Sequence, residues 1–498
     1  MIAWNAFMDY FIFGGKAVKI NLTLILSLAL ILKNLTVFQT VCYRISQIST
    51  KKLILLILAI AFLARLGWVF WSPHAAPSPG TEDLYMLRHA HNLAHGKGYL
   101  ESARNLSAET TQSSPVYASD RPIGYALWLA TIFKLFGEHI WLVEFTQVLF
   151  GTLSVFLVYY LGVQTLGRGA GLLGAGLLAI YPTSIFASKI ICEEHLFIPL
   201  WLFGISLIVS DFQNPSWKKV ILAGLIFGLG AHVRTYSFAM GLVIFFLWVV
   251  FKKQFGKAFL RAFVVQLIIL FLALPWAIRN YYRVGEPILY STWVGTALYF
   301  SNNDTSDLAH PVNPTLEQGG DLEFLTAKNE FERNRTGKKA AFQWIVTHPY
   351  LFVQKAASRV IYMLGLTREG WTVQDNFYTI QPGRKQPSGR LIRQFDKMDS
   401  DYYGTIFLLA LFGFLFFLVD RKQDLKKQSF WSVLLTIGYY LSIVAITIGY
   451  RKYRLPLEPL FCILAGYALI RLFSQPIKTE PIPRAYFVLD SEMDSKAQ

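Results

Sequence analysis

Apolar runs long enough to cross a bilayer recur along most of this 498-residue chain. A spanning helix needs about 20 mostly apolar residues, and ten core runs come near that length. They lie at 53–72, 140–162, 168–186, 191–210, 218–233, 235–251, 259–278, 403–419, 429–449 and 455–473. The pattern predicts an all-α polytopic membrane protein with about 10–12 transmembrane helices.

The segments around these runs predict how the chain is divided. An apolar stretch at 20–46 is a possible extra anchor, and it lacks the small-residue cleavage site of a signal peptide. The predicted divisions are an N-terminal extension at 1–50, a transmembrane catalytic module at 51–278 that includes an outer loop at 73–139, an outer-face segment at 279–402 with surface or re-entrant helices, C-terminal transmembrane helices at 403–473, and a cytoplasmic tail at 474–498.

Basic residues mark one side of the membrane. If each run crosses once, four basic groups share a side: Lys51 and Lys52; Lys218 and Lys219; Lys252, Lys253 and Lys257; and the segment 421–427. Cytoplasmic loops carry an excess of Lys and Arg, so this side is predicted to be the cytoplasm. The two long segments, 73–139 and 279–402, then lie on the outer face.

The composition supports the membrane interpretation and disfavours two others. Hydrophobic residues make up 54% of the chain and charged residues 16%, against about 25% charged in soluble proteins. The net charge of +16 resides largely beside the apolar runs, where topology already requires it, so we expect no nucleic-acid partner. Cys42, Cys192 and Cys462 form no CxxC or Cys/His cluster, which disfavours a disulfide framework or a zinc site.

A group of cations breaks the positive-inside pattern. Arg451, Lys452 and Arg454 fall on the outer side, where Arg234 and Arg279 also end predicted spans. Three basic sites at one leaflet suggest a bound phosphate, which suits the bidentate fork of arginine. The alternative is a snorkelling cluster that binds lipid headgroups or Glu458.

Carboxylates lie on the same predicted side. Glu82 and Asp83 stand at the expected start of a helix, where helix capping is the alternative to catalysis. Glu193 and Glu194 lie at membrane depth, where acids are functional candidates by default, although one of them could pair with Lys189.

Acids and cations on the outer face suit one kind of reaction. A carboxylate takes the proton of an attacking hydroxyl, and Arg and Lys stabilise the charge on a departing phosphate. The substrate would therefore be a phosphate-linked lipid. Three sequons, at Asn105, Asn303 and Asn334, are glycosylation sites only in a host that modifies them.

Five segments together resemble the polyprenyl-phosphate-sugar-dependent glycosyltransferases of the GT-C fold, the family of protein O-mannosyltransferases and lipid A aminoarabinose transferase. The segments are "AHNLAHGKGY", "RPIGYALWLATIFKLFG", "SKIICEEHLF", "LPWAIRNYYRVGEPILYSTWVGTALYFSNN" and "YRKYRLPLEPLFCILAGYAL". They occur in the family's order along roughly residues 53–473. Two positions depart from the family pattern, since Ile123 and His195 each stand where the family has a proline.

The resemblance implies a role for each candidate residue. The catalytic base falls on Asp83, with Glu82 as the alternative, and Glu194 orients the base or the acceptor. Residues expected to hold the donor's phosphate are Arg234, Arg279, Arg451, Lys452 and Arg454, with Arg454 first. The matched segments add Arg121, Tyr125 and Glu193 to the expected substrate-binding residues.

The implied reaction is transfer of a hexose or pentose from a polyprenyl-phosphate donor to a hydroxyl of a protein, lipid A or another glycan or glycolipid, with inversion. No cofactor is required, and a divalent metal is possible but not indicated. The expected location is a bacterial inner membrane, with the site facing the periplasm. The alternative is a lipid-sugar flippase, which predicts internal repeats and short loops that the sequence does not show.

Overall fold

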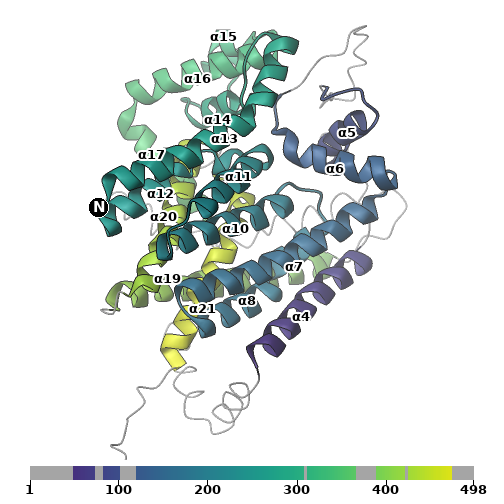
Figure 1. Ribbon diagram of the computed structural model, residues 1–498. Helices are drawn as coiled ribbons and strands as arrows, with labels where there is room; N and C mark the ends of the chain where they lie inside the picture. The colour runs from purple at the N-terminus through teal and green to yellow at the C-terminus, as the bar shows by residue number, and fades with distance from the viewer. Residues whose placement is uncertain are drawn as a thin grey trace, which may run out of the picture.

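The protein is a helical bundle in the computed structural model, which describes residues 49–72, 82–100, 119–307, 311–365, 389–420 and 424–473 (Figure 1). The longer helices are α4 (Thr50–Trp71), α5 (Glu82–Ala94), α6 (Ile123–Phe136), α7 (Ile140–Thr165), α8 (Arg168–Ala179), α10 (Glu194–Gln213), α11 (Trp217–Val233), α13 (Phe255–Val284), α14 (Trp293–Ser301), α16 (Glu330–Thr347), α17 (Pro349–Met363), α19 (Gly389–Val419), α20 (Leu425–Ile446) and α21 (Glu458–Phe473). The shorter ones are α9 (Pro182–Ala187), α12 (Gly241–Leu247), α15 (Leu322–Leu325), the 3₁₀ turns η1 (Thr235–Ser237), η3 (Leu316–Gln318) and η4 (Arg451–Arg454), and the π-helical η2 (Trp248–Lys252).

Every predicted span coincides with a helix or a run of consecutive helices. Among the described residues, seven helical segments are long and apolar enough to cross a membrane: 50–71, 140–165, 194–213, 235–252, 255–283, 393–419 and 427–446. The other three predicted spans correspond to α8, α11 and α21, which are shorter. The predicted all-α, multi-span membrane architecture is therefore confirmed.

Two helices extend beyond their apolar runs. The helix predicted at 259–278 continues to Val284, and the one predicted at 403–419 begins at Gly389. The added turns are rich in polar residues, so a search for apolar windows misses them. The amphipathic stretches of both outer segments form α5 and α17, while the possible anchor at 20–46 lies outside the described residues.

The predicted crossing pattern brings the helix ends together as expected. At one end of the bundle, the amide of Gln213 donates to the carbonyl of Gln164 and to the hydroxyl of Ser429, both at 2.8 Å. This contact joins the ends of α7 and α10 to the start of α20. The basic residue Lys219 lies there too and caps the end of α10 through the carbonyl of Ser210.

The opposite end carries α5 and α6 on one side and α14, α15 and α16 on the other, away from the start of α4 and the end of α21 (Figure 1). Helix α17 links this outer group to the bundle. The guanidinium of Arg359 donates to the carbonyls of Ile446 and Thr447, both at 3.0 Å, and to the side chain of Asn302 at 2.9 Å. It thereby satisfies the carbonyls at the end of α20, just before η4.

A buried arginine lies within α4, which is the first spanning helix among the described residues. Arg65 of α4 is fully buried and donates to the carbonyls of Leu178 and Ala179 at 3.1 and 3.0 Å, and to the hydroxyl of Ser184 at 2.8 Å. These carbonyls lie at the end of α8, where a helix lacks donors of its own, so Arg65 supplies donors to two of them inside the bundle. The side chain passes directly over Gly151, where an added Cβ would come within 2.7 Å of its Nε.

Candidate functional site

Two glutamates and an arginine form what we call the acid–arginine cluster: Glu193, Glu194 and Arg234. The helix α11 runs antiparallel to α10, so the end of α11 meets the start of α10. One guanidinium nitrogen of Arg234 lies 3.2 Å from a carboxylate oxygen of Glu193 and also bonds the carboxylate of Glu194. All three side chains are at least nine-tenths buried. The cluster therefore holds two acids beside one cation in a place that excludes bulk water.

Aromatic rings enclose the Arg234 side chain. Its guanidinium carbon lies 5.2 Å from the ring centre of Tyr453 and 5.7 Å from that of Tyr236. The hydroxyl of Tyr440 donates to the carbonyl of Tyr453 at 2.7 Å, which fixes the turn η4 against α20. The acid–arginine cluster is thus attached to the segment that carries the outer cations.

Within η4 the cations have different surroundings. Arg454 is buried, donates to Glu458 at 2.8 Å and stacks on Tyr403, with 3.6 Å between guanidinium carbon and ring centre. The pairing of Arg454 with Glu458 agrees with the alternative given above, in which the outer cations bind lipid headgroups or Glu458. Arg451 is half-buried and lies over the ring of Tyr362 at 5.0 Å. Because Arg454 is enclosed and Arg451 is not, Arg451 is the better placed of the two to meet a lipid headgroup.

A small cavity joins the two buried ion pairs. It measures about 30 Å³ and is lined by Glu194, His195 and Glu458 among others. One carboxylate oxygen of Glu194 has no hydrogen-bond partner among the described residues. The cavity is large enough for a water molecule, which would satisfy this oxygen and link it towards Glu458.

The predicted base stands at the start of α5, since Glu82 and Asp83 form its first turn. The helix is held by a stack of rings. His89 lies parallel to Tyr99 at 4.0 Å and meets the edge of Tyr85 at 4.3 Å. Burial, opposed in part by the charge of Asp120, lowers the pKa of His89 to about 4, so this imidazole is neutral at neutral pH.

Arg279 continues this arrangement at the end of α13. It donates to the carbonyl of Tyr99 at 2.7 Å and to the side chain of Asn280 at 2.6 Å, and it stacks on Trp276. In the structure it therefore positions the connection after α5. Arg121 lies over the ring of Trp293, with 5.1 Å between guanidinium carbon and ring centre.

Two residues that the sequence analysis did not select, Glu330 and Asn280, connect the segment at Ser119 to the outer helices and to α13. Glu330 accepts from the backbone nitrogen of Ser119 at 2.5 Å and from the hydroxyl of Thr292 at 3.2 Å. Asn280 donates to the hydroxyl of Ser119 at 2.8 Å and to the carbonyl of Ile288 at 2.8 Å. Both residues bond Ser119, which is far from them in the chain. Only Asn280 lies in one of the family-like segments, so only Asn280 could have been selected from the sequence.

Other expected residues have structural partners. Lys189 bonds the carboxylate of Glu144 at 3.2 Å and the carbonyl of Val69 at 2.8 Å. The hydroxyl of Tyr125 is buried and donates to Gln147 at 2.9 Å, close to the acid–arginine cluster. Asn303, the first residue of a sequon, has a structural role in its loop. Its side-chain amide donates to three backbone carbonyls, and Lys355 donates to the carbonyl of Asn303 itself. Asn105 lies outside the described residues.

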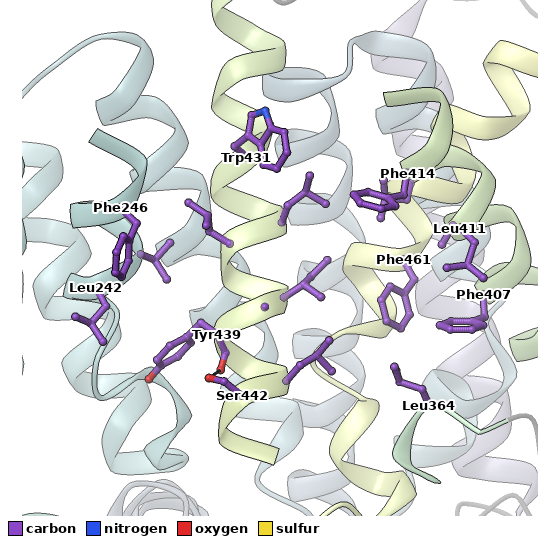
Figure 2. A pocket seen from close by; sticks show the side chains of 18 residues that line it. Leu242, Phe246, Leu364, Phe407, Leu411, Phe414, Trp431, Tyr439, Ser442 and Phe461 are labelled. Carbon is purple, nitrogen blue, oxygen red and sulfur yellow. Dashed lines mark hydrogen bonds between the residues drawn. The ribbon is translucent and has the colours of Figure 1, made fainter. Parts of the chain in front are cut away.

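An apolar groove lies between helices of the bundle. Its volume is about 700 Å³, and α12, α19, α20 and α21 line it with side chains that include Phe246, Phe407 and Trp431 (Figure 2). Leu364, which directly follows α17, also lines it. Tyr362, under Arg451, is two residues before Leu364 in the chain, so the groove wall and the half-buried cation belong to adjoining segments.

Comparison with known proteins places the buried cluster within a matched segment. Residues 120–278 match the family model described as dolichyl-phosphate-mannose-protein mannosyltransferase. Over this segment the chain resembles that family. The resemblance inferred from the motifs is thereby confirmed there, and the segment contains Glu193, Glu194 and Arg234. The motifs around Asp83 and Arg454 lie outside it, and the roles of all candidate residues, inside and outside the segment, stay predictions.

The comparisons also found one curated protein and several solved structures that are similar to this chain. The putative mannosyltransferase YycA of Bacillus subtilis strain 168 is 27% identical over 229 residues, which are 45% of this chain and 31% of that protein. The match thus spans about a third of that relative. The oligosaccharyltransferase AglB from Archaeoglobus fulgidus, in complex with an inhibitory peptide and a dolichol-phosphate, is 11% identical with a TM-score of 0.47, over 84% of this chain and 50% of that one. ArnT from Cupriavidus metallidurans, bound to undecaprenyl phosphate, is 10% identical with a TM-score of 0.40, over 84% of this chain and 78% of that one.

Proposed function

We propose that the protein is a GT-C-fold membrane glycosyltransferase that moves a sugar from a polyprenyl-phosphate donor to an acceptor hydroxyl on the outer face of the membrane. The observation that carries this proposal is the acid–arginine cluster inside the segment that matches the mannosyltransferase family. A cluster of buried carboxylates held by arginine at a bundle end suits an enzyme site. The match to a transferase family favours transfer over the flippase alternative.

The donor would use two adjoining features. Its polyprenyl chain would lie in the apolar groove, whose lining is suited to an isoprenoid chain (Figure 2). Its phosphate would meet Arg451 and Lys452, which are half-buried on η4. Arg234 and Arg454 would act less directly, because each is already bonded to glutamate.

The reaction would proceed by direct displacement. Asp83, or Glu82 in its place, takes the proton of the acceptor hydroxyl while the acceptor oxygen attacks the anomeric carbon. The bond from that carbon to the phosphate oxygen breaks, and polyprenyl phosphate leaves with its charge stabilised by the η4 cations. Attack opposite the leaving group inverts the configuration. Glu194, held by Arg234, would orient the acceptor or the base.

The remaining assignments follow the same proposal. The sugar would be a hexose or a pentose, and the acceptor a protein, lipid A or another glycan or glycolipid. The site would face the periplasm from the inner membrane, because the lysine-rich ends of the bundle lie at its other side. This chemistry requires no metal.

The test is donor turnover by the full chain in nanodiscs. A panel of radiolabelled polyprenyl-phosphate sugars is supplied with a membrane extract as acceptor, and release of the free lipid phosphate is measured. We expect Asp83→Asn to lower turnover by about 10²–10⁴-fold, the usual contribution of a general base, while donor binding persists. Arg451→Ala should weaken donor binding.

A matched control is Glu323→Gln, which changes an exposed acid of the outer segment that pairs with Lys339 at 2.9 Å. It should leave turnover unchanged. Full turnover by Asp83→Asn and by Glu82→Gln would remove both residues from the mechanism. If no donor is consumed but vesicles containing the protein move the lipid-linked sugar between leaflets, the protein is a flippase.

A further inference from the structure

A cluster of metal-ligating side chains lies at the far end of α5 from Glu82 and Asp83. His91 and His95 are one helical turn apart and project from the same face. Glu138 reaches them from the turn between α6 and α7, 47 residues along the chain from His91. We call these three residues the His–His–Glu cluster.

The donor atoms of the cluster already lie close together. An imidazole nitrogen of each histidine and a carboxylate oxygen of Glu138 all lie within 4.8 Å of one another. The two imidazole rings are 4.2 Å apart. Around a tetrahedral zinc ion with bonds of about 2.0–2.1 Å, ligand atoms lie roughly 3.4 Å apart. Small side-chain rotations therefore suffice to close the cluster on an ion.

The histidine nitrogens that lie near Glu138 are the two Nδ1 atoms. Nδ1 of His91 lies 2.7 Å and Nδ1 of His95 lies 3.7 Å from the same carboxylate oxygen of Glu138. Nδ1 of His95 also lies 2.9 Å from the carbonyl of His91, and a carbonyl only accepts, so without an ion this nitrogen carries the proton. An ion bound here would take the place of the proton on each Nδ1, and each imidazole would then carry its proton on Nε2.

We propose that the His–His–Glu cluster binds one divalent transition-metal ion, zinc in the first instance. Two imidazoles with one carboxylate form a ligand set that zinc uses when it retains a water molecule in its fourth position. All three side chains are about half exposed, so an ion and its water can reach them. The site is separate from the proposed transfer chemistry, because about ten residues of helix, roughly 15 Å, lie between it and Asp83.

The ion would connect α5 to the turn that begins α7. This connection fixes the last turn of the helix whose first turn carries the predicted base. The site is thus structural, and its occupancy does not depend on whether the protein is a transferase.

The experiment measures metal binding by the full chain in detergent. Protein stripped with a chelator is titrated with Zn²⁺, and bound metal is counted by mass spectrometry. Co²⁺ provides a second probe, because a four-coordinate ion with nitrogen ligands absorbs visible light strongly. We expect one ion per chain, and at least tenfold weaker binding in H91A, H95A and E138Q.

The control is H348A, which removes an exposed histidine of the outer segment outside the cluster. It should bind metal as the wild type does. Zn²⁺ should also raise the thermal midpoint of the wild type and of H348A, but not of H91A. Absence of stoichiometric binding at micromolar Zn²⁺, or binding that survives H91A and H95A together, would show that these residues form a hydrogen-bonded surface group only.

Discussion

The acid–arginine cluster leads to a quantitative prediction about Arg234. Replacement by Met removes the cation but keeps an apolar stem of similar length. Glu193 and Glu194, which are 3% and 1% exposed, would then remain beside each other without Arg234. Breaking a buried ion pair by removing one partner costs about 3–5 kcal/mol, because the remaining charge loses its compensation. We expect a loss of this size in the free energy of unfolding.

Neutralising the acids should recover much of that loss. The triple variant Arg234→Met, Glu193→Gln and Glu194→Gln removes the cation together with both acids that it bonds, and replacing a whole buried ionic group is often near neutral. Its free energy of unfolding should therefore lie closer to the wild type than that of the single variant. Because the three side chains touch, their effects are not additive, and the difference measures the coupling between them.

The assay is equilibrium unfolding in mixed micelles with increasing SDS, followed by tryptophan fluorescence. Arg335→Met, an exposed arginine on α16, is the matched control and should change stability by less than about 0.5 kcal/mol. The reasoning fails if Arg234→Met costs less than about 1 kcal/mol, or if the triple variant is no more stable than the single one.

Two further predictions concern the ring stack and the outer helices. His89 has a folded-state pKa of about 4, below its ordinary 6.5. As the pH falls through this window the unfolded chain takes up a proton that the fold excludes, so stability drops by about 3 kcal/mol and then levels off below pH 4. His89→Phe should remove this drop, which is measured as the difference between the unfolding midpoints at pH 7 and pH 4. An equal drop in the wild type and in His89→Phe would contradict the assignment. His139→Gln, which changes an exposed histidine, is the control. Gly295→Ala should destabilise the contact of α14 with α16 by about 1–3 kcal/mol, since its Cβ would overlap the carbonyl oxygen of Asn334. Gly176→Ala, which meets nothing within 4 Å, should be neutral or stabilising in the same unfolding assay.

The sequence predicted the helices of the bundle well because a bilayer imposes a length on apolar runs. It erred where other forces set the boundary. The run predicted at 168–186 breaks after Ala179, because Pro182 starts a new short helix and Arg65 satisfies the freed carbonyls. Such a break depends on a residue more than 100 positions away, which local patterning does not contain.

The candidate site was predictable in part for the same reason. Glu194 and Arg234 flank two consecutive spans, so a hairpin of helices brings them together. The Arg454 and Glu458 pair also follows from helical spacing, but the sequence alone did not decide between that pair and a free cation. Glu138 lies beside His91 and His95 because α5 packs against α6. No sequence motif links these three residues, so this cluster was not predicted.

The buried Arg65 also constrains how the chain can be made. Its acceptors on α8 lie 113 and 114 residues further along. At a synthesis rate of about 5–20 residues per second, roughly 6–23 s pass between the emergence of the arginine and that of its partners. During that interval α4 carries a charge that the hydrocarbon disfavours. Helix α4 is therefore expected to wait in the insertion machinery or at the membrane surface, and to insert fully only when α8 arrives, which makes biogenesis of this protein a cooperative event among distant segments.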